Sequence, residues 1–161
     1  MKKILRPFLV LLLFLGFVAS AHAQTMNGAF QVNVGAGAAL HSPVRFDLDS
    51  SAEYFWNDTY SIGLDFDILA RGATAFDFIP FVRYHFDLDR WPRFSPYIGG
   101  GMGVKFNTTS QSWFDLMLPE LGFSYEWNPH FYIGPNISLH TLAGSNTTWD
   151  LQLLAQATYR F

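Results

Sequence analysis

Residues 149–161 have the sequence WDLQLLAQATYRF, in which two kinds of side chain alternate. The odd-numbered positions from Trp149 to Phe161 are all apolar, and the even-numbered positions are polar except for Leu154. Because successive side chains of a β-strand point to opposite faces of the sheet, this period of two predicts a strand with one apolar face and one polar face. The fold class then depends on how many such strands the chain contains and on what covers each face.

Seven upstream segments show the same alternation and lie at 30–40, 45–56, 60–68, 76–86, 97–106, 117–127 and 131–140. In the sixth of these segments, Met117 falls on the apolar face together with Leu121. Residues that favour turns, such as Asn57-Asp58, separate the segments. We therefore predict eight antiparallel strands, and an even number places both ends of the domain on the same side.

The first residues have the order of a secretory signal peptide. Positive charges at Lys2 and Lys3 precede an apolar run over 8–18, and small residues at Ala21 and Ala23 follow it. The run is too short to cross a bilayer as a helix, which needs about 20 apolar residues. We therefore predict a cleaved signal peptide over 1–23 and a single mature domain over 24–161.

The composition excludes several classes of protein. The chain has 161 residues, of which 50% are hydrophobic, and this fraction excludes a disordered polypeptide. Nucleic-acid binding is not expected, because 10 Lys and Arg residues are outnumbered by 13 Asp and Glu residues. Cysteine is absent, so disulfides, thiolate metal sites and cysteine catalysis are excluded as well.

The chemistry of the two faces indicates where each one points. The polar faces are rich in glycine and contain Arg, Asp and Glu but only one lysine, Lys105, which suits a narrow interior better than bulk water. Apolar faces with aromatic residues near the strand ends suit lipid, and closure removes the unpaired strand edges that hydrocarbon does not tolerate. The sequence predicts an all-β, eight-stranded, antiparallel, up-and-down transmembrane β-barrel.

Two stretches carry a resemblance to a known family. The segment SPYIGGGMGV at 95–104 and the last strand, which ends in Tyr159-Arg160-Phe161, resemble the small OmpA/OmpX-type outer-membrane β-barrels of Gram-negative bacteria. The resemblance implies export through the periplasm to the outer membrane, with Tyr159 and Phe161 as the signal that the barrel-assembly machinery recognises. It also implies a monomer surrounded by outer-membrane lipid and lipopolysaccharide, with a structural role in envelope integrity.

An eight-stranded barrel has an interior that its own side chains fill, so charges placed there must pair. We therefore predict a structural salt-bridge network in the lumen, with at most minor leakage of solutes. His85, His140 and Asp150 lie on the same faces. The predicted network consists of Arg45, Asp47, Asp49, Glu53, Asp65, Asp67, Asp77, Arg83, Lys105, Glu120, Glu126 and Arg160.

A lipid-modifying enzyme is the first alternative. Asp65 and Asp67 share a face, as do Asp47 and Asp49, and His85 or His140 would serve as the base. Lipid A deacylases of the PagL type also have eight strands and a His-x-Ser motif, but here His140-Thr141-Leu142 has leucine at the position of the serine. We therefore expect no enzymatic activity.

A secreted, lipocalin-like barrel that binds an apolar ligand is the second alternative. It requires Phe66, Val82, Phe123 and Leu153 to line an interior cavity, whereas a membrane barrel requires them to point outward. The direction of these side chains separates the two hypotheses.

No metal or cofactor is expected. His41, His85, His130 and His140 lie without the spacing of a ligand set, and the paired aspartates offer at most a weak calcium site.

Overall fold

A computed structural model describes residues 27–40, 44–71, 73–88, 90–108, 111–144 and 147–161. The predicted signal peptide over 1–23 and His41 lie outside the described residues. No helix in the described ranges is long and apolar enough to cross a membrane.

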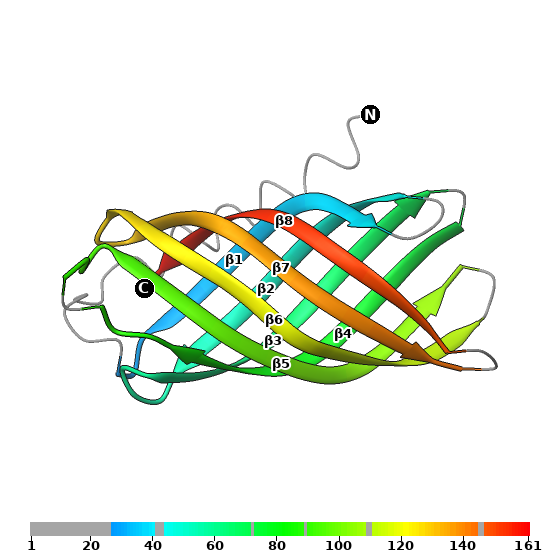
Figure 1. Ribbon diagram of the computed structural model, residues 1–161, viewed down its shortest axis with the longest axis horizontal. Coiled ribbons are helices and arrows are strands. Elements are labelled where there is room, and N and C mark those ends of the chain that lie inside the picture. Colours follow the sequence, from blue (N-terminus) through cyan, green and yellow to red (C-terminus); the bar gives the residue numbers. More distant parts are fainter. Residues whose placement is uncertain (1–26, 41–43, 72, 89, 109–110, 145–146) are drawn as a thin grey trace.

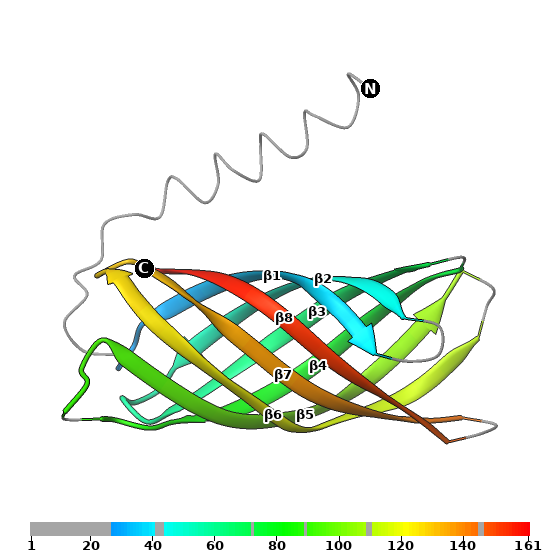
Figure 2. The same ribbon diagram turned by 45° about the horizontal axis from the view of Figure 1, so that its top comes forward.

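The eight strands form one closed, antiparallel barrel in which each strand pairs with its neighbours in sequence and β8 pairs with β1. Figures 1 and 2 show the strands running diagonally around a single barrel. The strands are β1 (Phe30–Leu40), β2 (Arg45–Phe55), β3 (Tyr60–Arg71), β4 (Ala73–His85), β5 (Phe94–Asn107), β6 (Ser112–Asn128), β7 (Phe131–Ala143) and β8 (Thr148–Arg160).

The start of β1 and the end of β8 lie side by side, because Gln31 pairs with Arg160. We call this the terminal end of the barrel and the opposite one the loop end. The turns at 56–59 and 129–130 are at the terminal end, and the end of β7 and the start of β8 are at the loop end (Figure 1). The predicted even strand number and the common side of the two ends of the domain are confirmed.

The alternating side chains divide between the outer wall and the lumen. Val82, Phe66 and Leu153 point outward, with 48%, 38% and 39% of their surfaces exposed. Arg83, which follows Val82 in the same strand, is buried. Large apolar side chains on the outside and charges on the inside are the arrangement of a barrel in lipid. The lipocalin alternative fails, because it needs these apolar residues inside.

Several strands extend by a few residues beyond the predicted bounds, and the sixth strand also departs from the predicted pattern of faces. The sixth strand begins at Ser112 rather than at 117, and its pairing with both neighbours shifts between Met117 and Glu120. The extra residue is a β-bulge, and a bulge exchanges the inward and outward positions on its two sides. Met117 is therefore 1% exposed and faces the lumen, so its predicted place on the apolar outer face is wrong.

Two glycines make room for aromatic rings inside the barrel. A side chain on Gly63 would collide with the ring of Phe81, and one on Gly122 would collide with the ring of Tyr97. Glycine is found in strands where another group approaches the backbone closely. Phe81 and Tyr97 can therefore lie across their neighbouring strands and fill the lumen.

Candidate functional site

The terminal half of the lumen contains a buried arginine between two glutamates. Arg83 on β4 donates from Nη1 to Oε2 of Glu53 on β2 at 2.8 Å, and from Nη2 to Oε1 of Glu120 on β6 at 2.5 Å. Its Nε bonds to the same Glu120 carboxylate at 3.0 Å. The guanidinium also lies over the Phe81 ring, 4.1 Å from its centroid. A charge-assisted fork of this kind fixes three strands relative to one another.

Neutral donors complete the coordination of both glutamates. Gln31 Nε2 donates to Glu53 at 2.6 Å, and Ser61 Oγ donates to the other oxygen of the same carboxylate. Asn136 Nδ2 donates to Glu120 Oε1 at 2.6 Å. A buried charge is tolerated when hydrogen bonds satisfy it. Both glutamates meet this condition, so they and Arg83 form a hydrogen-bonded network.

A second arginine closes the lumen at the terminal end. Arg160 on β8 donates from Nη2 to Gln31 Oε1 at 3.0 Å and from Nη1 to the Tyr132 hydroxyl at 3.0 Å. His85 Nε2 lies 3.0 Å from Glu53 Oε1. We call Glu53, Arg83, His85, Glu120 and Arg160 the arginine cluster.

The loop half of the lumen is strongly acidic. Lys105 on β5 lies 2.6 Å from Asp77, 3.7 Å from Asp115 and 3.7 Å from Asp150. His140 Nδ1 lies 3.1 Å from Asp115 Oδ2. We call these five residues the lysine cluster. One ammonium group is thus the neighbouring positive charge of three carboxylates, and all three are almost completely buried.

A further group of carboxylates lies on β2 and β3. Asp49 pairs directly with Asp67 across the two strands, and Asp47 and Asp65 are on the same inward face. Within the described residues, none of the four forms an ion pair. We call Asp47, Asp49, Asp65 and Asp67 the aspartate cluster.

No protein-family profile and no curated protein sequence matches this chain. Solved structures do. Neisserial surface protein A (NspA) matches with a TM-score of 0.67 at 16% identity, over 83% of this chain and 96% of that one. The N-terminal β-barrel domain of Pseudomonas aeruginosa OprF matches with a TM-score of 0.60 at 13% identity, over 86% and 100%. The outer membrane enzyme PagL matches with a TM-score of 0.57 at 11% identity, over 80% and 98%.

The chain has the fold of the small outer-membrane β-barrels. Barrels that share this fold differ in activity, because function lies in sites that are built on the fold. The function of this barrel therefore depends on the geometry of its own lumen clusters and outer wall.

Five of the predicted lumen residues form ion pairs in the described part of the chain. Ion pairs among the described residues join Glu53, Asp77, Arg83, Lys105 and Glu120, in two separate groups. Among the described residues, no ion pair joins the other predicted members to one another. Arg45 and Glu126 are half-buried near opposite ends, and Arg160 bonds to neutral groups. The remaining predicted members are Asp47, Asp49, Asp65 and Asp67.

Sequence reasoning missed Asp115, which is completely buried in the lysine cluster. If the inward position of Glu120 is extended toward the start of β6 with an unbroken period of two, Asp115 falls on the outer wall. The bulge shifts this alternation by one residue, so Asp115 faces the lumen instead. Pro119 was the available signal, since proline within a sheet is confined to edges, strand starts and bulges.

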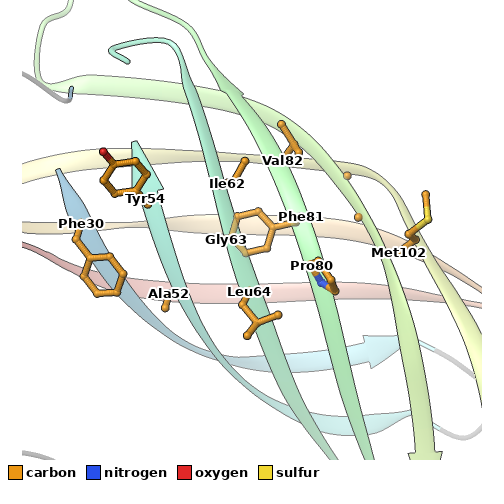
Figure 3. Close-up of a pocket in the computed structure, with 12 residues that line it drawn as sticks. Phe30, Ala52, Tyr54, Ile62, Gly63, Leu64, Pro80, Phe81, Val82 and Met102 are labelled. Atoms are coloured by element: carbon orange, nitrogen blue, oxygen red, sulfur yellow. The ribbon is translucent and has the colours of Figure 1, made fainter. Parts of the chain in front are cut away.

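The outer wall of the barrel has two shallow apolar grooves. One has a volume of about 690 Å³, is lined by residues including Tyr54, Leu64 and Met102, and runs over the glycine at position 63 (Figure 3). The other has a volume of about 680 Å³ and is lined by residues including Leu48 and Phe123. The walls of both grooves are apolar, which suits contact with hydrocarbon chains.

Proposed function

We propose that this outer-membrane barrel has a structural role in the integrity of the envelope, and that its filled lumen admits at most minor leakage of solutes. The observation that carries the proposal is the arginine cluster, in which Arg83 joins Glu53 and Glu120 across the lumen. An eight-stranded barrel is just wide enough for side chains to fill. A bonded plug of this kind stabilises the barrel and obstructs a water path.

The partners proposed for this role are outer-membrane lipid and lipopolysaccharide along the apolar wall, with the protein acting as a monomer. Tyr159 and Phe161 are proposed as the signal for the barrel-assembly machinery. The rings of these two residues lie 4.9 Å apart between centroids, and Phe161 also contacts Phe30 at 6.0 Å. These contacts tie the end of the chain to the first strand.

Conductance tests the filled lumen. We expect the wild-type protein in planar lipid bilayers to give no steady open level, because the arginine cluster occupies the terminal half of the lumen. The double variant Glu53→Ala, Glu120→Ala removes the partners of Arg83 and is expected to raise the frequency of brief openings. A steady ohmic current through the wild-type barrel would contradict a filled lumen.

The structural role is tested in the native host. Cells that lack the protein are expected to take up more of a membrane-impermeant dye in the presence of detergent, and re-expression is expected to restore the barrier. Equal dye uptake with and without the protein would contradict the envelope role while leaving the lumen prediction intact.

A hydrolase is the second candidate, since PagL shares the fold and one hydrogen-bonded set has the right residue types. Ser138 Oγ lies 3.0 Å from His140 Nε2, and His140 Nδ1 lies 3.1 Å from Asp115. However, Ser138 is 2% exposed and His140 is fully buried inside the barrel, so no acyl chain on the outer wall reaches the hydroxyl. We propose that these bonds are structural and that the protein is not an enzyme.

Covalent labelling tests this point. A fluorophosphonate probe is expected to leave the folded barrel unlabelled, because the probe cannot reach Ser138. Cells that express the wild type or the Ser138→Ala variant are expected to contain lipid A of the same mass. Labelling that disappears in Ser138→Ala, together with a loss of acyl mass only in the wild type, would establish the enzyme instead.

A further inference from the structure

We propose that the aspartate cluster is a binding site for a divalent cation with oxygen ligands, and specifically for calcium. One carboxylate oxygen from each of Asp49, Asp65 and Asp67 lies within 4.8 Å of the others. Two oxygens bonded to the same calcium ion at about 2.4 Å are at most about 4.8 Å apart. The barrel therefore brings the three side chains near enough to one another to converge on one ion.

Two amide side chains on β8 hold the carboxylates in place. Gln156 Nε2 donates to Asp49 Oδ2 at 2.8 Å, and Gln152 Nε2 donates to Asp67 Oδ2 at 3.4 Å. The Oδ1 atoms of Asp49, Asp65 and Asp67 are buried and have no hydrogen-bond partner among the described residues. In Asp49 and Asp67, the amide therefore binds one carboxylate oxygen and leaves the other free. Carboxylates that bind metals are commonly oriented in this way by a neighbouring hydrogen-bond donor.

Glycine makes this orientation possible. Gly35 on β1 lies in register between Asp49 on one side and Gln156 on the other. A Cβ at this position would come within 3.0 Å of both Asp49 Oδ2 and Gln156 Cγ. The missing side chain leaves the space through which the amide reaches the carboxylate across the strand.

Asp47 is an independent indication of a missing positive charge. Its side chain is completely buried, and neither carboxylate oxygen has a hydrogen-bond partner in the described part of the chain. It lies on the inward face two residues before Asp49, which pairs with Asp67 across β2 and β3. A buried carboxylate without a partner is costly, and a cation in the cluster would remove that cost.

The lysine cluster shows how the same barrel treats carboxylates that have their own cation. Asp77, Asp115 and His140 also bring ligand atoms within 4.8 Å of one another. There, however, Lys105 Nζ lies 2.6 Å from Asp77 and 3.7 Å from Asp115, so a positive charge is already present. Among the described residues, no ammonium group forms an ion pair with the aspartate cluster, so the proposal concerns this cluster and not the lysine cluster.

The ligand types favour calcium over other ions. Carboxylate oxygens select hard cations, whereas zinc and copper prefer sites with nitrogen or sulfur ligands. Calcium accepts irregular sets of about 6–8 oxygens, while magnesium requires near-octahedral geometry and keeps most of its water. Four carboxylates from two adjacent strands form an irregular and strongly negative set, which suits calcium.

Thermal unfolding and calorimetry test the site on the mature barrel, purified in non-ionic detergent without lipopolysaccharide. After treatment with EDTA, calcium chloride is expected to raise the unfolding temperature in a concentration-dependent manner, because a ligand that binds only the folded state stabilises it. Titration calorimetry is expected to show one site per chain. Magnesium is expected to give a smaller shift at the same concentration.

Two variants locate the site. Asp67→Asn is expected to weaken calcium binding by about tenfold or more and, in EDTA, to be at least as stable as the wild type because one repelling charge is gone. Glu126→Gln is the matched control: it also removes one carboxylate, but it lies near the terminal end, and we expect unchanged calcium binding. Heat-dependent migration on gels verifies that both variants are folded.

Three outcomes would overturn the proposal. The first is an unfolding temperature that is the same in EDTA and in millimolar calcium, with no heat of binding. The second is a calcium effect that Asp67→Asn retains in full, which would place the ion elsewhere. The third is a wild-type barrel that ignores calcium but becomes more stable as the pH falls from neutral to mildly acidic, which would show that shared protons neutralise the cluster.

Discussion

Replacing Arg83 with methionine is expected to lower the free energy of unfolding by about 3–5 kcal/mol, the cost of breaking a buried ion pair by removing one partner. Methionine keeps much of the packing volume next to Phe81, so the loss reports on charge. Glu53 and Glu120 then remain buried without the guanidinium that lies 2.8 Å and 2.5 Å from their oxygens. Equilibrium unfolding in urea, with the barrel in detergent micelles, measures the difference.

Two controls separate the ion pairs from other effects. Arg93→Met removes an arginine from the exposed connection before β5 and is expected to change the unfolding free energy by less than about 0.5 kcal/mol. Adding Glu53→Gln and Glu120→Gln to Arg83→Met removes the uncompensated charges and is expected to restore most of the lost stability. If the triple variant is no more stable than Arg83→Met, the loss comes from packing and not from the buried carboxylates.

Leu153→Arg is expected to lower the unfolding free energy by about 2–4 kcal/mol, because it places a charge on the lipid-facing wall near the middle of the bilayer. Leu153 points outward from the middle of β8 and pairs with Ile137, another outward residue. Reversible unfolding of the barrel in lipid vesicles gives the difference.

Leu40→Arg is the matched comparison for this substitution. Leu40 is equally exposed, at 40% against 39% for Leu153, but it is the last residue of β1 and lies at the loop end. The cost of arginine falls to about 0–1 kcal/mol near the membrane surface. Equal costs at both positions would show that Leu153 does not lie deeper in lipid than Leu40.

The fold was predictable because each strand has one apolar face and one polar face. In β8 apolar and polar side chains alternate at every position except Leu154, which is apolar on the polar face. Side chains in a strand repeat every two residues, so the sequence alone determines which positions share a face. The pattern failed in β6, where the bulge after Met117 adds one residue and the repeat changes phase.

The lumen was predictable in composition but not in its contacts. The alternation placed Arg83 and Glu120 inside, but they are 37 residues apart in the chain and meet only because of the barrel register. Register depends on turn geometry and bulges, which the alternating pattern does not determine. For the same reason, the sequence did not indicate that Lys105 lies next to three aspartates while the aspartate cluster has no ammonium group.

The bulge in β6 makes the length of this strand more critical than any one of its side chains. Deleting one residue between Met117 and Glu120 would rotate the whole segment from Ser112 to Met117 by half a turn. Asp115 would then enter lipid and Phe114 would enter the lumen, so a single change would damage both surfaces at once. The spacing from Asp115 to Glu120 therefore determines which side chains of β6 face the lumen and which face outward.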